Sequence, residues 1–248
     1  VPLVISHLKV GGTSYFGRSK QTLRMIDQAQ KKQPVGFDVY PYVASSTVLG
    51  VKRLEQASRI LVTWSKTLPE MAGRDLSDIA KEMDTDITGA AKALAPAGAI
   101  YFMMSEDDVQ RILSHPSAMI GSDGLPHDDH PHPRLWGTFP RVLGHYVREQ
   151  QLFPLEEAIR RMTSLPAAQF GLKDRGKISA GFFADLVLFN PDTVIDRATF
   201  GAPTEPAEGI DLVFVNGRAV WEDGESTGAR PGIALRRQTL ASMGLTTL

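Results

Sequence analysis

Residues 1–42 read VPLVISHLKVGGTSYFGRSKQTLRMIDQAQKKQPVGFDVYPY and carry a strand, a helix and a second strand in succession. Residues 1–5 are apolar without polar alternation, which is typical of a buried strand in a parallel sheet. Residues 19–32 show apolar positions at helical spacing and end in two lysines, which suit the negative end of a helix dipole. Residues 35–40 form the second strand, which ends at a proline. This βαβ unit predicts an α/β fold.

The composition is that of an ordinary globular chain and excludes several classes. The 248 residues are 42% hydrophobic and 22% charged, unlike a disordered, collagen-like or coiled-coil protein. A net charge of −1 provides no field that would attract nucleic acid or an anionic membrane, and no apolar run is long enough to cross a bilayer. The absence of cysteine excludes disulfides, thiolate metal ligands and a cysteine nucleophile. We expect no nucleic-acid or membrane partner and a cytoplasmic location.

The chain opens at Val1 directly in a strand pattern, with no initiator Met and no targeting segment before it. We expect it to be the later part of a longer protein, in which any signal peptide would lie upstream. A processed mature N-terminus is the alternative.

The strand–helix alternation is interrupted between residues 42 and 98. This stretch shows mixed helical pieces, with helices predicted at 51–64 and 76–83. Long excursions from a βα scaffold are usually lids or binding loops, so we predict a lid insertion here. The alternation then resumes, with predicted elements at 99–104 (strand), 106–113 (helix) and 117–121 (strand).

The last third of the sequence changes from helical to strand periodicity. Helices are predicted at 138–151 and 154–170, the second with Pro154 in its first turn and Gly171 as its C-cap. Asn216-Gly217 is typical of a type I′ hairpin turn. Strands are predicted at 184–190, 212–215 and 218–222, which together form a small antiparallel unit.

The parallel part indicates a barrel or a doubly wound sheet. A complete (β/α)8 barrel takes about 250 residues, and this chain also contains an insertion and a β tail. We therefore predict the C-terminal part of a barrel over residues 1–174, with the lid insertion at about 42–98. A small β domain and C-terminal tail follow over residues 175–248.

Two strand ends carry residues with catalytic chemistry. His7 and Lys9 follow the first strand, and a period of two places them on one side. A neutral imidazole there could bind a metal, and the ammonium could hold an anionic substrate group; a hydrogen-bonded core histidine is the alternative. Asp123 follows the 117–121 strand between two glycines, where a carboxylate could act as a general base toward a metal-bound water. A turn or helix cap is the alternative role for Asp123.

Three histidines and two aspartates crowd into residues 127–132, a composition that would suit a metal site. Prolines fix a kinked, extended path through this segment, so we favour a solvated loop with some active-site contact. No GxGxxG, Walker, HExxH or GxSxG motif is present.

Four segments together resemble the metal-dependent amidohydrolases, and among these the N-acyl-D-amino-acid deacylases (D-aminoacylases). They are ISHLK at 5–9, GFDVYPY at 36–42, GSDGLPHDDHPHPRLWGTFPRVLG at 121–144 and EEAIRRMTSLPAAQFGLKDRGKISAGFFADLVLFNPDTV at 156–194. The Asp-His-Pro segment is the most specific to the deacylases. The resemblance implies a TIM-type (β/α)8 barrel with a lid over the pocket, followed by part of a small β-sandwich domain.

The resemblance also implies roles for individual residues. His7 matches a metal-binding histidine at the end of barrel strand six. Asp123 matches the strand-eight aspartate, which is the catalytic base and faces a second, more weakly held metal position. Four residues match those around the substrate α-carboxylate, and Lys52 is adjacent to the last of them: Lys9, Tyr40, Ser46 and Arg53. Two cations and two hydroxyl groups suit a carboxylate.

In the family, the other metal ligands lie upstream of anything in this chain: a His-x-His pair near strand one, a cysteine and a further histidine. A catalytic zinc requires about three protein ligands and a water, whereas this chain offers His7 and, at the weaker position, Asp123. We expect one tightly held Zn²⁺ in the intact protein, with a second, weaker site. We expect the chain alone to bind zinc poorly, to be inactive and to need the missing N-terminal portion to complete the barrel.

The resemblance implies zinc-dependent hydrolysis of an N-acyl-D-amino acid, the small-molecule partner, to a D-amino acid and a carboxylate. One alternative is a cyclic amidase of the hydantoinase or dihydroorotase kind. A second alternative is a fragment without catalytic activity, or a binding subunit that needs a partner chain.

Overall fold

The computed structural model describes residues 3–235 and divides into two compact units. The first comprises Val1–Arg141 and Asp196–Ala207, and the second comprises Val142–Ile195 and Glu208–Leu248. The boundary predicted at residues 174–175 falls inside the second unit and stays a prediction. Residues 1–2 of the first predicted strand and 236–248 of the predicted β domain lie outside the described residues. Among the helices of residues 3–235, none combines the length and apolar character that a bilayer crossing requires.

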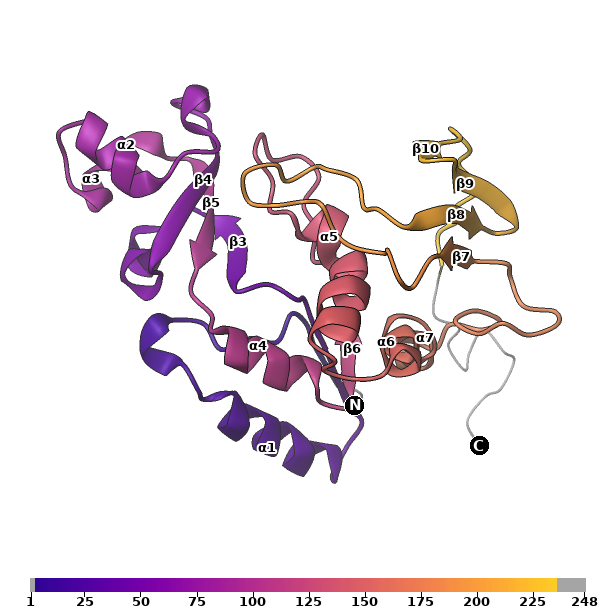
Figure 1. Cartoon of the computed structure of the whole chain (residues 1–248). Helices are drawn as coiled ribbons and strands as arrows, with labels where there is room; N and C mark the ends of the chain where they lie inside the picture. The colour runs from indigo at the N-terminus through magenta and orange to yellow at the C-terminus, as the bar shows by residue number, and fades with distance from the viewer. Residues whose placement is uncertain (1–2, 236–248) are drawn as a thin grey trace, which may run out of the picture. The chain divides into compact units, whose positions relative to one another are not determined.

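The first unit contains a three-stranded parallel sheet in the order β1-β2-β6, formed by Leu3–Ile5, Val35–Val39 and Ala118–Ile120. Helices α1 (Ser19–Gln30) and α4 (Glu106–Leu113) pack against each other, and each contacts a strand of this sheet (Figure 1). The central strand β2 is buried at four of its five positions because it has neighbours on both edges. The strands and helices predicted for this part are confirmed.

A second sheet of the first unit is antiparallel, in the order β3-β5-β4. Its strands are Ala44–Val48 (β3), Arg59–Ser65 (β4) and Ala97–Phe102 (β5). The helix predicted over residues 51–64 is therefore wrong. Residues Val51–Gln56 form a 3-10 helix (η2), and the β-branched and aromatic residues that follow pair with β5, which tertiary pairing favours over helix formation.

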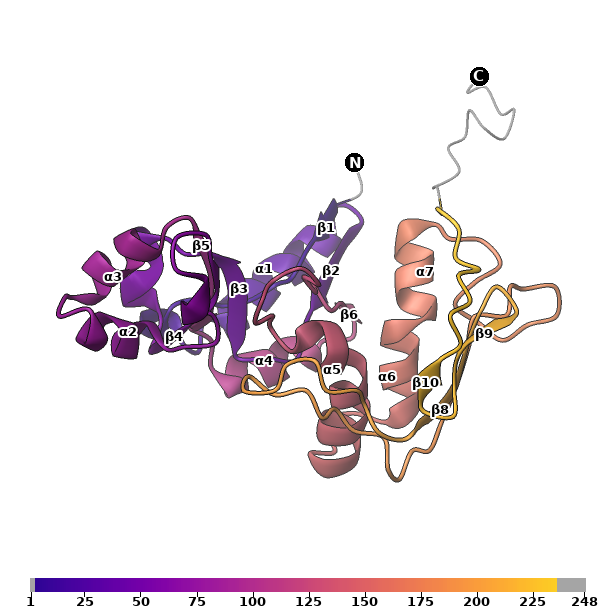
Figure 2. The same cartoon turned by 90° about the horizontal axis from the view of Figure 1, so that it is seen from above.

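Short helices accompany this second sheet. Helix α2 (Leu76–Glu82), which the sequence predicts, contacts β4 and packs against α3 (Ile87–Leu94), as Figure 2 shows. Asp86 caps α3, since its carboxylate accepts the Gly89 N–H at 2.6 Å. Two 3-10 turns complete the unit: η1 (Thr13–Tyr15) and η3 (Pro69–Met71).

The helices over residues 134–170 differ from the predicted ones in their bounds. The helix predicted at 138–151 begins earlier, as α5 (Arg134–Arg141), and continues as a π-helix, η4 (Val142–Glu149). The helix predicted at 154–170 is broken into α6 (Leu155–Met162) and α7 (Ser164–Phe170). Pro166 lacks an N–H for the Met162 carbonyl, so it is tolerated only in the first turn of a new helix. Gly171 ends α7 in the left-handed conformation, as predicted.

The second unit also contains a four-stranded antiparallel sheet. Its strands are Leu186–Phe189 (β7), Ile210–Val215 (β8), Arg218–Glu222 (β9) and Glu225–Ser226 (β10). They lie in the order β10-β9-β8-β7. Asn216 and Gly217 both have positive φ (48° and 76°) in the predicted hairpin turn between β8 and β9.

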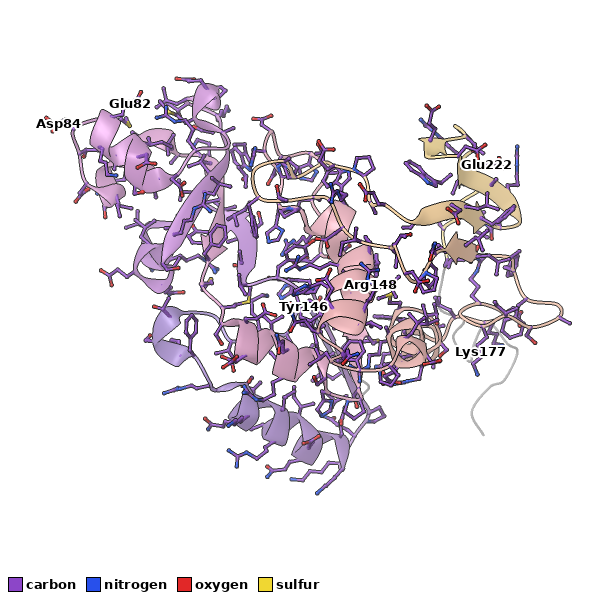
Figure 3. All side chains as sticks on the ribbon, viewed as in Figure 1. Glu82, Asp84, Tyr146, Arg148, Lys177 and Glu222 are labelled. Atoms are coloured by element: carbon purple, nitrogen blue, oxygen red, sulfur yellow. The ribbon has the colours of Figure 1, made fainter. Side chains whose placement is uncertain are left out.

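The π-helix η4 contacts the segment that precedes β8. Arg148 of η4, labelled in Figure 3, donates to the Val194 carbonyl at 2.7 Å.

Candidate functional site

His7 follows β1 in a strained backbone conformation with φ 45°. Its backbone N–H donates to Asp38 Oδ1 of the neighbouring strand β2 at 2.8 Å. A non-glycine residue with positive φ persists only where its surroundings hold it. Asp38 therefore fixes the turn that directs the His7 side chain.

Lys9 is the nearest cation to His7. Its Nζ lies 2.7 Å from His7 Nδ1 and donates to the His7 carbonyl at 2.7 Å. The ammonium also lies 5.3 Å from the centre of the Tyr40 ring. Burial lowers the pKa of Lys9 to about 8, and the carboxylate of Asp123 partly opposes this shift.

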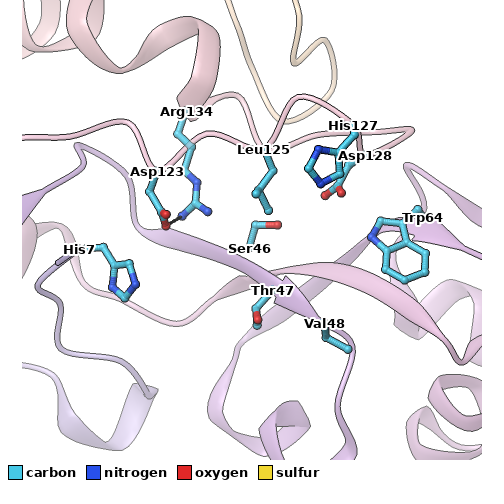
Figure 4. Close-up of a pocket in the computed structure, with 10 residues that line it drawn as sticks. All are labelled: His7, Ser46, Thr47, Val48, Trp64, Asp123, Leu125, His127, Asp128 and Arg134. Carbon is cyan, nitrogen blue, oxygen red and sulfur yellow. Dashed lines mark ion pairs between the residues drawn. The ribbon is translucent and has the colours of Figure 1, made fainter. Parts of the chain in front are cut away.

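Asp123 follows β6 and also has positive φ, at 48°. Its Oδ2 lies 2.9 Å from Arg134 Nη1 in an ion pair, and 2% of the Arg134 side chain is exposed (Figure 4). Gly124 is needed beside it, because a Cβ there would lie 2.4 Å from Leu135 Cδ1 at the start of α5. The loop after β6 is thus held tightly against α5, with the carboxylate kept in one direction.

Tyr40 follows the central strand β2, and its hydroxyl is buried. The Oη atom is buried and has no hydrogen-bond partner of good geometry among the described residues. Burial raises the pKa of Tyr40, so the phenol stays neutral and can donate. The Arg134 guanidinium lies 4.8 Å from the centre of the ring, and its buried Nε is likewise without a partner. Tyr40 and Arg134 therefore lie against each other beside the cavity that both line.

All the site residues predicted from the sequence line one cavity of about 440 Å³. The first sheet and the segments that follow its strands contribute most of them. The second sheet contributes Ser46 from β3, and η2 contributes Arg53; the neighbouring Lys52 does not line the cavity. The residues brought together are His7, Lys9, Tyr40, Ser46, Arg53 and Asp123.

A second cavity of about 550 Å³ adjoins the first and shares five lining residues with it: His7, Ser46, Thr47, Asp123 and Arg134. Its far end is lined by apolar side chains and by two polar residues of the loop after β6, as Figure 4 shows. The residues at this end are Val48, Trp64, Leu125, His127 and Asp128.

The histidine-rich loop is mostly structural. His132 is buried, its Nε2 donates to the Ala44 carbonyl at 3.1 Å, and its Nδ1 accepts the Arg134 N–H at 3.0 Å. Burial lowers the pKa of His132 to about 3, so the ring is neutral. His130 Nε2 contacts the Phe200 carbonyl at 2.7 Å. The loop contributes His127 and Asp128 to the second cavity.

Sequence reasoning missed three residues of the site. Asp38 and Arg134 both lie inside segments that resemble the deacylases. Each is a charged residue in or beside an otherwise apolar stretch, and this signal would have identified them as candidates. Trp64 was missed because the sequence favoured a helix where β4 lies. Its place in the cavity depends on strand pairing, which no local pattern reveals.

The donors in this part of the chain suit zinc in kind but not in number. His7 and Asp123 line the same cavity, and imidazole and carboxylate are both zinc ligands. Within residues 3–235, no group of three or more His, Asp or Glu side chains could hold a metal ion. Asp123 is also paired with Arg134. These two donors fit part of a zinc site and do not by themselves form one.

Comparison with known proteins identifies a matching family and several similar relatives. Residues 21–221 match the model of an amidohydrolase family. D-aminoacylase of Alcaligenes xylosoxydans xylosoxydans is 56% identical over 237 residues, which are 96% of this chain and 49% of that protein. This chain therefore spans about half the length of the curated relatives it matches.

Two solved structures agree in fold with this chain. One is D-aminoacylase, studied for the role of its binuclear metal centre; it is 59% identical, with a TM-score of 0.90 over 92% of this chain and 48% of that chain. The other is N-acyl-D-glutamate deacylase of Bordetella bronchiseptica, complexed with zinc and a phosphonate inhibitor that mimics the tetrahedral intermediate. It is 51% identical, with a TM-score of 0.91 over 95% of this chain and 50% of that chain.

Proposed function

Because the chain belongs to the amidohydrolase family, we propose that it is part of a zinc-dependent deacylase that hydrolyses N-acyl-D-amino acids to a D-amino acid and a carboxylate. Relatives named D-aminoacylase, N-acyl-D-aspartate deacylase and N-acyl-D-glutamate deacylase, which are 50–56% identical, support this assignment. The intact protein would combine this chain with the segment that carries the remaining metal ligands.

The parallel sheet β1-β2-β6 would form adjoining strands of a (β/α)8 barrel. His7, Tyr40 and Asp123 all follow the carboxyl ends of strands in this sheet, which is where barrel enzymes place their catalytic residues. The second sheet and its helices would be the lid, since Ser46 and Arg53 reach the cavity from it. The antiparallel sheet of the second unit would be part of the small β-sandwich domain.

The cationic end of the first cavity would hold the α-carboxylate of the substrate. Lys9 and Arg53 supply positive charge, and the Tyr40 and Ser46 hydroxyls supply neutral donors. Several donors that converge on one carboxylate fix the orientation of the Cα substituents, and this orientation would select the D-enantiomer.

Asp123 would act as the base. Its carboxylate is positioned by Arg134, lines the same cavity as the carboxylate-binding residues, and would accept a proton from the attacking water and return it to the leaving nitrogen. His7 would be the metal ligand of this chain. Zinc, when bound at the completed site, would lower the pKa of a water toward about 7 and polarise the amide carbonyl.

The observation that carries this proposal is the single cavity lined by a candidate metal ligand, a candidate base and four carboxylate-binding side chains. The test is an assay of the full-length protein with N-acetyl-D-methionine, N-acetyl-D-glutamate, their L-enantiomers and hydantoin. Hydrolysis of the D-substrates alone would support the proposal. Hydrolysis of hydantoin in preference to the linear amides, or no hydrolysis of any of them, would overturn it.

A further inference from the structure

The two cavities share one stretch of lining, which includes the candidate hydrolytic residues, and each extends beyond it. Both are lined by His7, Ser46, Thr47, Asp123 and Arg134. The first cavity continues to Lys9 and Arg53, and the second continues to Trp64. A substrate whose reacting carbonyl lies at the shared residues would therefore extend one end toward cations and the other toward an indole ring.

The Trp64 end of the second cavity offers apolar surface. Val48 is 63% exposed and Leu125 is 36% exposed, and both line this cavity with the partly buried Trp64. Apolar side chains exposed inside a concave site are typical of a pocket for a hydrocarbon group. His127 and Asp128 line the same end and interact with each other, and burial raises the pKa of Asp128, so the apolar side chains are what this end offers a ligand.

The backbone holds Trp64 in position by two devices. The pairing of β4 with β5 shifts register between Val62 and Trp64, and a β-bulge of this kind re-aims the side chain that follows it. Trp64 is paired with Gly98, and a Cβ at Gly98 would lie 2.2 Å from Trp64 Nε1. The indole therefore lies across a backbone position that only glycine leaves open.

We propose that Val48, Trp64 and Leu125 form the acyl-group pocket and that Trp64 sets a preference for uncharged acyl groups longer than acetyl. This inference rests on the proposed deacylase function. In an N-acyl-amino acid, the carboxylate and the side chain lie on one side of the amide nitrogen, and the acyl chain lies beyond the reacting carbonyl. With the carboxylate at Lys9 and Arg53, the acyl chain points toward Trp64.

The test uses the full-length protein and N-acetyl, N-butyryl and N-hexanoyl derivatives of D-methionine. An added methylene that is largely buried raises kcat/KM by up to about fourfold. The hexanoyl substrate is expected to exceed the acetyl substrate in kcat/KM by about tenfold. Trp64→Ala is expected to reduce this ratio to within about twofold of one, because the loss of kcat/KM falls mainly on the hexanoyl substrate. Trp64→Phe, which retains an aromatic ring, is expected to give an intermediate ratio.

Ile87→Ala is the matched control, because Ile87 is a 43% exposed apolar residue of α3 that lines neither cavity; its ratio is expected to equal that of wild type. If wild type has equal kcat/KM for the acetyl and hexanoyl substrates, the acyl pocket is overturned and the proposed deacylase function is unaffected. The acyl pocket would also be overturned if the Trp64 variants kept the acyl preference and instead changed the preference for the side chain of the D-amino acid. N-acyl derivatives of D-alanine and D-leucine measure that second preference. No hydrolysis of any N-acyl-D-amino acid would overturn both.

Discussion

Arg134 Nη1 lies 2.9 Å from Asp123 Oδ2, with 2% of the arginine side chain and 39% of the aspartate side chain exposed. The pair connects the loop after β6 to the first residue of α5. A buried guanidinium without its carboxylate would be an unpaired buried charge, which is costly. The ion pair therefore fixes the direction of the Asp123 carboxylate, which lines the cavity.

Replacing Lys9 by Met is expected to raise KM for N-acetyl-D-methionine roughly 10- to 100-fold, the range for loss of a hydrogen bond to a charged group. The substrate carboxylate would lose a partly buried cation of its binding site. The measurement is steady-state kinetics of the full-length protein, with Lys52→Met as the control, because Lys52 is adjacent to Arg53 and lies outside the cavity lining. An unchanged KM for Lys9→Met would remove Lys9 from carboxylate binding.

Asp38→Ala is expected to lower kcat/KM by about 10- to 100-fold, as for other residues that orient metal ligands. The His7 N–H would lose its acceptor, and the positive φ of His7 would no longer be held. Asp38→Asn keeps an acceptor oxygen and is expected to remain within a few-fold of wild type. Equal loss in the two variants would show that the negative charge of Asp38, and not its hydrogen bond, is what matters.

Residues 1–248 produced alone are expected to bind zinc weakly and to show no deacylase activity. The described residues provide two donors in one cavity, and a catalytic zinc needs about three protein ligands. Zinc affinity can be measured by competition with a chromophoric chelator, with the full-length protein as the reference. Submicromolar zinc binding by the chain alone would contradict this expectation.

The stability of the first unit is expected to fall as the pH is lowered from about 6.5 toward 3. The pKa of His132 is about 3 in the fold and about 6.5 in an unfolded chain, so the unfolded state binds more protons in this window. The unfolding free energy should therefore decrease by up to about 1.4 kcal/mol per pH unit from this group. Urea unfolding of wild type and His132→Gln at several pH values measures the difference. A partly exposed histidine, His145, provides the control variant His145→Gln, and identical pH slopes for wild type and His132→Gln would contradict the prediction.

Local patterns predicted the parallel sheet well because its elements have strong periodicity and end at clear helix- or strand-terminating residues. The helix at Ser19–Gln30 is an example in which the spacing of apolar residues determines the local structure. The hairpin at Asn216-Gly217, in the other unit, is an example in which turn chemistry does so. In the second sheet, the strand predicted at 99–104 corresponds to β5 (Ala97–Phe102). The other two strands were missed, and Arg59–Ser65 becomes a strand only through pairing with β5, which is distant in sequence. Long-range pairing of this kind overrides local propensity.

In the candidate site, too, some residues could be predicted from local sequence and others depend on long-range packing. His7 and Asp123 were found because they follow predicted strands, and the four carboxylate-binding residues came from resemblance to a family. Trp64 was missed because its place in the cavity depends on strand pairing, which the sequence does not display. The pocket at Trp64 in particular depends on a β-bulge and on the missing side chain of Gly98.

The decisive measurement is the turnover of N-acetyl-D-methionine by the full-length protein and by its Asp123→Asn variant. Asparagine tolerates the positive φ of residue 123 and keeps an oxygen for Arg134, so the fold should be retained, as circular dichroism can verify. Loss of the base is expected to lower kcat by about 10²- to 10⁴-fold. A folded Asp123→Asn protein with near-normal kcat would contradict the assignment of Asp123 as the base and the proposed site with it.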